Sequence, residues 1–214
     1  MSEHIERELD AHREALELYC DPDSFLNEAT GGRLFTRDGR RTMLATDDLL
    51  AGLHLALDET LGDAAGEVLY LFGCEWGKQN VIGFEQRFAR AFGNPPADML
   101  FSMVLQAWWW PLQASGFGTW RYDLEHHDEG LIYVDVWDSM VSAPAGGHAA
   151  CHFYAGMFAA VFGHFANREL SAIEIQCTGT GESHCRFLVG SSRRINAPHF
   201  WRDRKSDGDP AHEL

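Results

Sequence analysis

The stretch Glu174-Ile-Gln-Cys177-Thr-Gly-Thr-Gly-Glu-Ser-His-Cys185 decides how the C-terminal half of this chain is expected to fold. Its two cysteines flank a short turn that contains two glycines, and the segments on either side, 171–177 and 184–190, are typical of short strands. We therefore expect a hairpin in which Cys177 and Cys185 face each other. A third cysteine, Cys151, lies near the start of the helix predicted before this hairpin.

These three cysteines and Glu174 form a candidate metal site. Zinc prefers four soft or borderline ligands in a tetrahedral arrangement, and Glu174 can join the cysteines if its strand ends or bulges near it. Four protein ligands leave no open position, so the pattern indicates a structural site that clamps a helix to a hairpin. Spacing alone leaves two alternatives, a set of buried free thiols or a Cys177–Cys185 disulfide, because C-x7-C is less specific than paired C-x2-C motifs.

The same residues carry a family resemblance. The pattern Glu174-x2-Cys177-x7-Cys185-x-Phe187-x-Val189, with Cys151-x4-Gly156 upstream, resembles the 4-vinyl reductase domain, a small-molecule binding domain. In the phenol- and toluene-sensing bacterial transcription activators that carry this domain, the matching Cys, Glu, Cys and Cys bind zinc. The resemblance therefore implies a structural zinc ion held by Cys151, Glu174, Cys177 and Cys185.

The resemblance also implies a fold and an assembly. The fold would be α+β and like the NO-signalling and Golgi-transport ligand-binding domains, with mixed helices, a small antiparallel sheet and the zinc-stapled C-terminal hairpin. Homodimers would form through the N-terminal half. A looser likeness to the sensory region of the same activators runs through Gly32-Arg-Leu-Phe, Arg41-Thr-Met-Leu and Leu71-Phe-Gly-Cys-Glu-Trp76-Gly77, so it spans residues 30–190. Those activators continue into an ATPase domain and a DNA-binding helix-turn-helix, whereas the phosphate-loop pattern GxxxxGK[ST] does not occur in this sequence.

Composition sets the remaining bounds. The chain has 214 residues, of which 45% are hydrophobic and 12% aromatic, enough for a substantial core. Its net charge of −15 argues against binding to nucleic acid or to an anionic membrane surface. The first residues are charged throughout and no run approaches 18 apolar residues, so we expect a cytoplasmic protein whose thiols stay reduced.

Periodicity predicts the elements before the metal motif. Asp38-Gly39 predicts a tight two-residue hairpin turn, because glycine readily adopts the positive φ angles that such a turn requires. Gly73 and Gly77 allow close backbone approach or a bend within their helix. The expected helices are 3–19, 46–62, 64–92 (one or two helices), 99–110 and 149–167, and the expected strands are 118–126 and 131–137. We expect a helical arm over 1–30, a sensor-like dimerisation half over 31–115, a ligand-binding half of the 4-vinyl reductase type over 116–192 and a tail over 193–214.

Aromatic residues suggest where a ligand would bind. Trp108, Trp109 and Trp110 cannot share one helix face, so one or two of them should face a partner chain, a ligand or a cleft. Trp137, in the context Val-x-Val-Trp-x-Ser, matches a tryptophan that in the aromatic sensors binds the phenol hydroxyl group through its indole N–H. The sensors' second polar contact, a histidine, would fall within 101–106, where this chain has none and a serine or glutamine would substitute. The expected ligand-binding residues are Phe101, Ser102, Gln106, Trp108, Trp137 and Tyr154, although core packing explains each aromatic taken singly.

Catalysis is the less favoured hypothesis. The G-x-S-x-G, H-E-x-x-H and G-x-G-x-x-G patterns are absent, and a zinc with four protein ligands has no position for water. The sequence therefore favours a stand-alone sensor or carrier of an aromatic or hydrocarbon molecule that signals through a protein partner. Two alternatives remain. The name of the domain suggests a vinyl reductase of bacteriochlorophyll synthesis or an accessory protein that holds the tetrapyrrole, and a dimerisation adaptor would fill its pocket with its own tryptophans.

Overall fold

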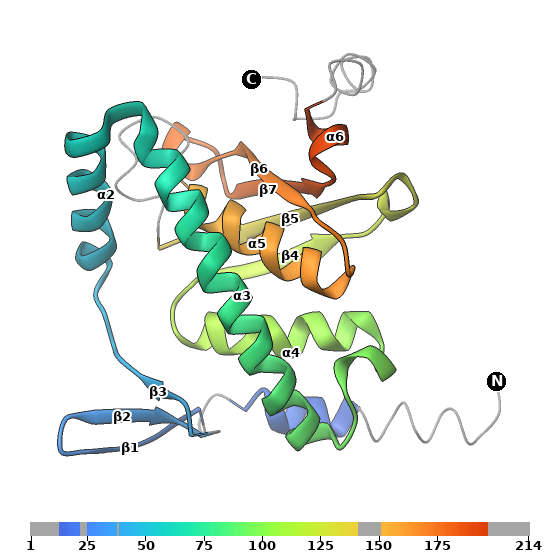
Figure 1. Ribbon diagram of the computed structural model, residues 1–214. Coiled ribbons are helices and arrows are strands. Elements are labelled where there is room, and N and C mark those ends of the chain that lie inside the picture. The colour runs from blue at the N-terminus through green and yellow to red at the C-terminus, as the bar shows by residue number, and fades with distance from the viewer. Residues whose placement is uncertain (1–12, 22–24, 38, 141–150, 197–214) are drawn as a thin grey trace. The chain divides into compact units, whose positions relative to one another are not determined.

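The computed structural model describes residues 13–21, 25–37, 39–140 and 151–196 (Figure 1). The chain divides into two compact units, the first made of Met1–Ala45 and Ile82–Gly116 and the second of Thr46–Val81 and Phe117–Leu214. The predicted arm before residue 13, most of the predicted tail and the loop 141–150 lie outside the described residues.

The first unit combines a small sheet with helices. Strands β1 (Leu26–Thr30), β2 (Arg33–Thr36) and β3 (Arg41–Thr42) form an antiparallel sheet, and residues 13–19 are helical. The predicted hairpin is confirmed, but its turn spans three residues, because the Thr36 N–H donates to the Arg40 carbonyl oxygen across it. Gly39 takes the left-handed conformation (φ 80°) that a three-residue hairpin loop requires.

Aromatic side chains pack inside this unit. Helix α4 (Phe101–Ala114) follows the short 3-10 helix η3 (Pro96–Asp98), and its Trp108 and Trp109 are fully buried. Trp110 is half-buried and its ring contacts those of Tyr19 and Phe25. Contacts within the chain therefore account for all three tryptophans without a partner chain or a ligand.

The second unit contains a four-stranded antiparallel sheet in the order β4-β5-β7-β6. Its helices α2, α3 and α5 agree with the predicted positions, and α3 is one continuous helix that extends into the first unit. The elements are α2 (Asp47–Leu61), η2 (Gly62–Ala64), α3 (Ala65–Phe92), β4 (Thr119–Asp123), η4 (His127–Glu129), β5 (Leu131–Trp137), α5 (His152–Phe165), β6 (Ser171–Gln176), η5 (Thr178–Thr180), β7 (Cys185–Gly190) and α6 (Ser192–Ile195).

The two faces of this sheet differ. Helix α5 covers one face, where the ring of Phe187 from β7 contacts those of Tyr154 and Phe158 (Figure 1). On the opposite face a second apolar cluster packs with Ile195 of α6; its buried members are Leu131, Tyr133, Ile175, Leu188 and Ile195. Strand alternation thus separates the residues that face α5 from those that face away.

Glycines let α3 and α5 touch backbone to backbone. A Cβ atom added at Gly156 of α5 would collide with the carbonyl oxygen of Tyr70 in α3, and one added at Gly73 would collide with the carbonyl oxygen of Phe153. Gly77 of α3 also lies close to α5, against the carbonyl oxygen of Met157. The predicted close approach at Gly73 and Gly77 is confirmed.

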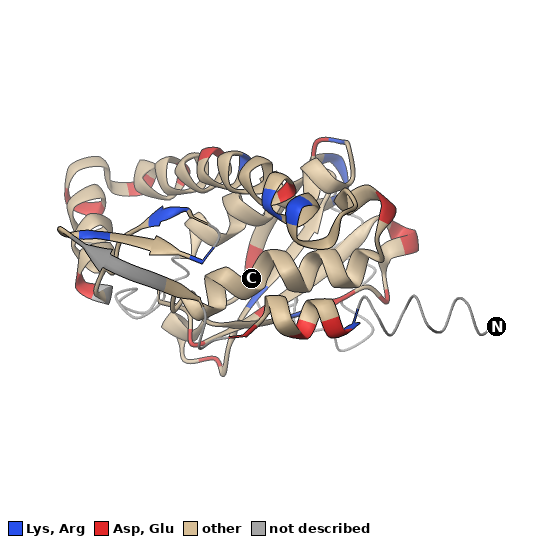
Figure 2. Cartoon of the chain, turned by 90° about the horizontal axis from the view of Figure 1, so that it is seen from below, with Lys and Arg blue, Asp and Glu red and all other residues tan. Residues whose placement is uncertain are grey.

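The predicted α+β class with antiparallel sheets and a C-terminal hairpin is confirmed. Strand β1 was not predicted. Among the described residues, no helix is both long enough and apolar enough to span a bilayer. Acidic and basic positions are interspersed along α3 (Figure 2).

Candidate metal centre and aromatic layer

The four predicted metal ligands come together in the second unit. One ligand atom from each of Cys151, Glu174, Cys177 and Cys185 lies within 4.8 Å of all the others. Cys151 lies directly before α5, Glu174 lies in β6, and Cys177 and Cys185 flank the turn between β6 and β7. All three cysteines are buried and none forms a disulfide.

A β-bulge brings Glu174 and Cys177 to the same side of β6. Residues three apart on a regular strand point to opposite faces, so both could not reach one metal ion. Here Glu174 pairs with Phe187 while Gln176 pairs with Arg186, so two residues of β6 oppose one of β7. The extra residue, Ile175, packs in the apolar cluster on the opposite face. The bulge that the sequence required as a condition is therefore present.

The sulfur geometry fits a tetrahedral ion. Cys185 Sγ lies 3.6 Å from Cys151 Sγ and 4.0 Å from Cys177 Sγ. A zinc–sulfur bond of about 2.3 Å places tetrahedral sulfurs about 3.8 Å apart, between these two distances. Glu174 Oε2 accepts a hydrogen bond from the Cys151 N–H at 3.0 Å, whereas its buried Oε1 has no hydrogen-bond partner within the described part of the chain. An unsatisfied carboxylate oxygen beside three thiols is the donor set that a thiophilic cation would complete.

Each sulfur also has a polar neighbour outside the ligand set. The Gly179 N–H donates to Cys177 Sγ at 3.4 Å, Thr178 Oγ1 lies 3.5 Å from Cys185 Sγ, and Ser139 Oγ lies 3.7 Å from Cys151 Sγ. Such groups orient the ligands and stabilise the negative charge of metal-bound thiolates. Ser139 and Thr178 were not predicted from the sequence, although Thr178 directly follows a ligand in the chain.

The acid–base properties of the metal-free cluster follow from burial and mutual hydrogen bonding. Hydrogen bonds from Cys151 and Cys177 lower the pKa of Cys185 to about 2, and the matching bonds, together with burial, raise the pKa of Cys151. Burial, followed by the negative charge of Cys185, raises the pKa of Glu174 to about 7. The cluster thus holds one thiolate next to groups that retain protons, and a bound cation would displace those protons.

Aromatic side chains form a layer between α5 and the sheet. Trp120 of β4 stacks on Phe158 of α5 with ring centroids 6.2 Å apart and 8° between the planes. The hydroxyl group of Tyr154 donates to the Phe117 carbonyl oxygen at 2.5 Å. The layer reaches solvent beside α3, where Phe72 is 47% exposed and Trp76 is half-buried. Rings in this region pair as Phe72 with Phe153, Trp76 with Phe153 and Trp76 with Phe117.

The structure divides the predicted ligand-binding residues among different places. Tyr154 is buried in the aromatic layer, whereas Trp137 stacks on His184 (5.0 Å between centroids) on the sheet face turned away from α5. Phe101, Ser102, Gln106 and Trp108 belong to α4 in the first unit, where Trp108 is buried and the other three are exposed. Trp76, Phe117 and Trp120, which were not among the predicted ligand contacts, carry the ring contacts of the layer.

Comparison with known proteins agrees with the metal motif. Residues 138–191 match the model of the 4-vinyl reductase domain family. This match covers all four candidate metal ligands, α5 and strands β6 and β7, and it confirms the resemblance drawn from the sequence. The uncharacterized protein MJ0150 of Methanocaldococcus jannaschii is 38% identical over 78 residues, which are 36% of this chain and 42% of that protein. The chain therefore spans less than half of the length of this relative.

The fold is similar to that of a solved sensory domain. The phenol-responsive sensory domain of the transcription activator PoxR, whose crystal structure was determined with phenol, superposes with a TM-score of 0.62. The match covers 90% of this chain and 95% of that one at 16% sequence identity. At this identity the similarity establishes the shared fold.

Proposed function

We propose that this chain is a small-molecule sensory or carrier protein in which a structural zinc ion supports a binding site for an aromatic or hydrocarbon molecule. The observation that carries the proposal is the match to the 4-vinyl reductase domain, because it covers both the Cys/Glu cluster and the aromatic helix α5. The fold similarity to a phenol-responsive sensory domain adds support.

The proposed zinc ion has a structural role. Three thiolates and one carboxylate would fill a tetrahedral shell, so the ion would supply positive charge and cross-linking without activating water. Cys151 would hold the start of α5, while Glu174, Cys177 and Cys185 would hold the β6–β7 hairpin. The protein groups around the sulfurs would orient these ligands.

The proposed ligand is small and aromatic because the second unit offers rings with few polar groups. Small-molecule sites are mostly lined by apolar and aromatic side chains, with a few polar groups that set orientation. Two locations are open to a ligand. The half-buried Trp137 is the location that the family resemblance implies, and the partly exposed patch around Phe72 and Trp76 is the location that ring exposure favours.

Titration of phenol into matched tryptophan variants tests the proposal. The wild-type protein is expected to bind phenol saturably, and Trp137→Ala is expected to weaken binding about tenfold, which corresponds to about 1.4 kcal/mol. Isothermal titration calorimetry gives the affinities, with Trp76→Ala measured in parallel. Weakening by Trp76→Ala alone would place the ligand beside α3 and remove Trp137 from the site. Failure of the wild-type protein to bind either phenol or toluene would contradict the aromatic-ligand proposal.

A second copy of the chain is the proposed partner of α2 and the start of α3. Large apolar side chains on these helices are exposed, more than isolated surface positions would give: Leu49, Leu53, Leu55, Leu61, Val68, Leu71 and Phe72. Analytical ultracentrifugation of the wild-type protein is expected to show a dimer. The double variant Leu49→Glu, Leu53→Glu is expected to be a folded monomer, because two charges one helical turn apart would be desolvated in the interface. Leu100→Glu, at an exposed position in the first unit, is the control and should remain dimeric; a double variant that stays dimeric would exclude this surface.

A further inference from the structure

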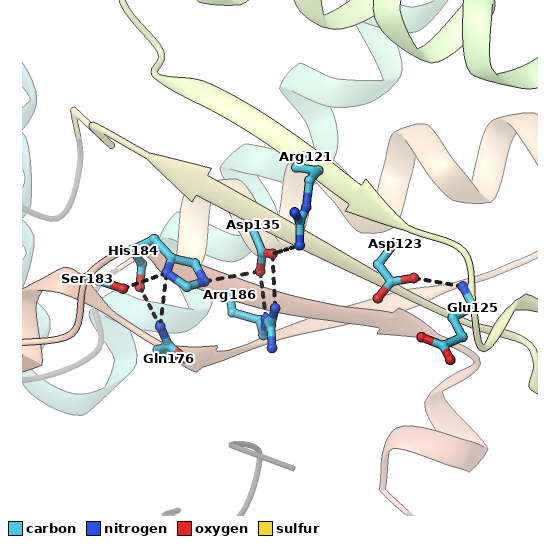
Figure 3. Close-up of polar contacts among 8 residues, drawn as sticks. All are labelled: Arg121, Asp123, Glu125, Asp135, Gln176, Ser183, His184 and Arg186. Atoms are coloured by element: carbon cyan, nitrogen blue, oxygen red, sulfur yellow. Dashed lines mark hydrogen bonds and ion pairs between the residues drawn. The ribbon is translucent and has the colours of Figure 1, made fainter.

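A buried carboxylate lies on the sheet face turned away from α5. Asp135 of β5 is only 2% exposed, and Arg186 of β7 binds both of its oxygens (Figure 3). Arg186 Nε donates to Oδ1 at 2.6 Å and Nη2 donates to Oδ2 at 3.0 Å. His184 Nε2 lies 3.4 Å from Oδ1 of the same carboxylate. Such a two-pronged arginine–carboxylate pair has a defined geometry as well as strength.

The partners of Asp135 flank a predicted metal ligand in the sequence. His184 and Arg186 are the residues directly before and after Cys185. Because side chains alternate along a strand, these two point away from α5 while Cys185 points toward Cys151. One carboxylate therefore contacts the chain on both sides of Cys185.

The same network reaches the second ligand of the hairpin. Gln176, which directly precedes Cys177, donates from Nε2 to the His184 carbonyl oxygen at 3.2 Å and lies 3.3 Å from His184 Nδ1. The residues that precede the two hairpin cysteines are thus hydrogen-bonded to each other (Figure 3). His184 also stacks on Trp137, two residues beyond Asp135 on β5.

From this arrangement we infer that Asp135 is a positioning residue for the metal centre, acting through Arg186 and His184 from the opposite face of the sheet. The inference rests on the proposed zinc site. Groups that orient metal ligands without touching the metal are usually other side chains on the same side; here the orientation would pass through the strand backbone. In this account Asp135 sets where the Cys185 sulfur lies relative to the sulfurs of Cys151 and Cys177.

Metal affinity and ligand-field spectra of variants test the inference. Asp135→Asn keeps the shape of the side chain but removes the charge that binds Arg186. It is expected to weaken zinc binding about 10- to 100-fold in competition with a chromophoric chelator, the usual effect of losing an outer-shell partner. The cobalt(II)-loaded variant is expected to show altered thiolate-to-metal and d–d bands, because the sulfur positions change. Arg121→Ala is the control, since Arg121 is 71% exposed and lies 3.9 Å from Asp135, and it should retain wild-type affinity and spectra.

A second variant covers the case in which Asp135→Asn does not fold. Arg186→Lys keeps the positive charge but loses the planar fork that binds both oxygens, and it is expected to weaken zinc binding about tenfold. Either folded variant with wild-type zinc affinity and cobalt spectrum would overturn the inference, even if its melting temperature fell. If the wild-type protein itself bound neither ion, the proposed metal site would fail, and the positioning role with it.

Discussion

Replacing Cys177 by serine is expected to release the bound metal and to lower the melting temperature sharply. A serine hydroxyl group is a poor zinc ligand, and Cys177 supplies one of three sulfurs that lie close together and buried. Zinc binding to structural sites is coupled to folding, with apparent free energies on the order of 10 kcal/mol. Inductively coupled plasma mass spectrometry gives the metal content, and differential scanning calorimetry gives the melting temperature.

Cys20→Ser is the matched control for this experiment. Cys20 is a free, half-buried cysteine of the first unit that lies outside the metal cluster. Its replacement should leave metal content unchanged and alter the melting temperature little. Unchanged metal content and melting temperature in Cys177→Ser would exclude the cluster as a metal site.

Gly156→Ala is expected to produce the largest loss of stability among single changes that add only one methyl group. The new Cβ would collide with the Tyr70 carbonyl oxygen and come close to the Cys74 amide nitrogen. Because these are backbone atoms, relief requires α3 and α5 to separate, at an expected cost of about 3 kcal/mol. Urea unfolding of the wild-type and variant proteins measures this difference.

Gly52→Ala provides the opposite expectation at another helical glycine. Gly52 lies within α2, and an added Cβ there meets no atom within 4 Å. Alanine is the better helix former, so this variant should be more stable by about 0.5–1 kcal/mol. Equal effects of the two glycine substitutions would show that α3 and α5 do not pack backbone to backbone.

Local sequence signals were sufficient for most elements and for the metal cluster. The hairpin between β6 and β7 follows from two strand patterns around a glycine-containing turn, and Cys177 and Cys185 lie at its ends. The pairing of Glu174 with Cys177 required a bulge, which the sequence allowed without specifying. The family resemblance selected the metal cluster over the alternatives of a disulfide or unrelated thiols.

Nonlocal pairing limited what the sequence could reveal. Alternation along β5 predicts that Asp135 shares a face with Trp137, but only the register between β5 and β7 shows that Arg186 lies opposite it. The same register separates Trp137 from Tyr154, which the sequence analysis had placed in one ligand-binding set. Strand β1 was missed because its segment, Leu-Asn-Glu-Ala-Thr, lacks the run of β-branched and aromatic residues that marks most strands.

Native mass spectrometry of the freshly purified protein tests the central claim most directly, because it reports metal, assembly and retained small molecules together. The account predicts one zinc ion per chain in a dimer, with the zinc lost when the protein is denatured. An added small mass would identify the class of bound molecule. A metal-free chain from a preparation kept reduced and free of chelator would contradict the claim that this 4-vinyl reductase region is built around a structural metal ion.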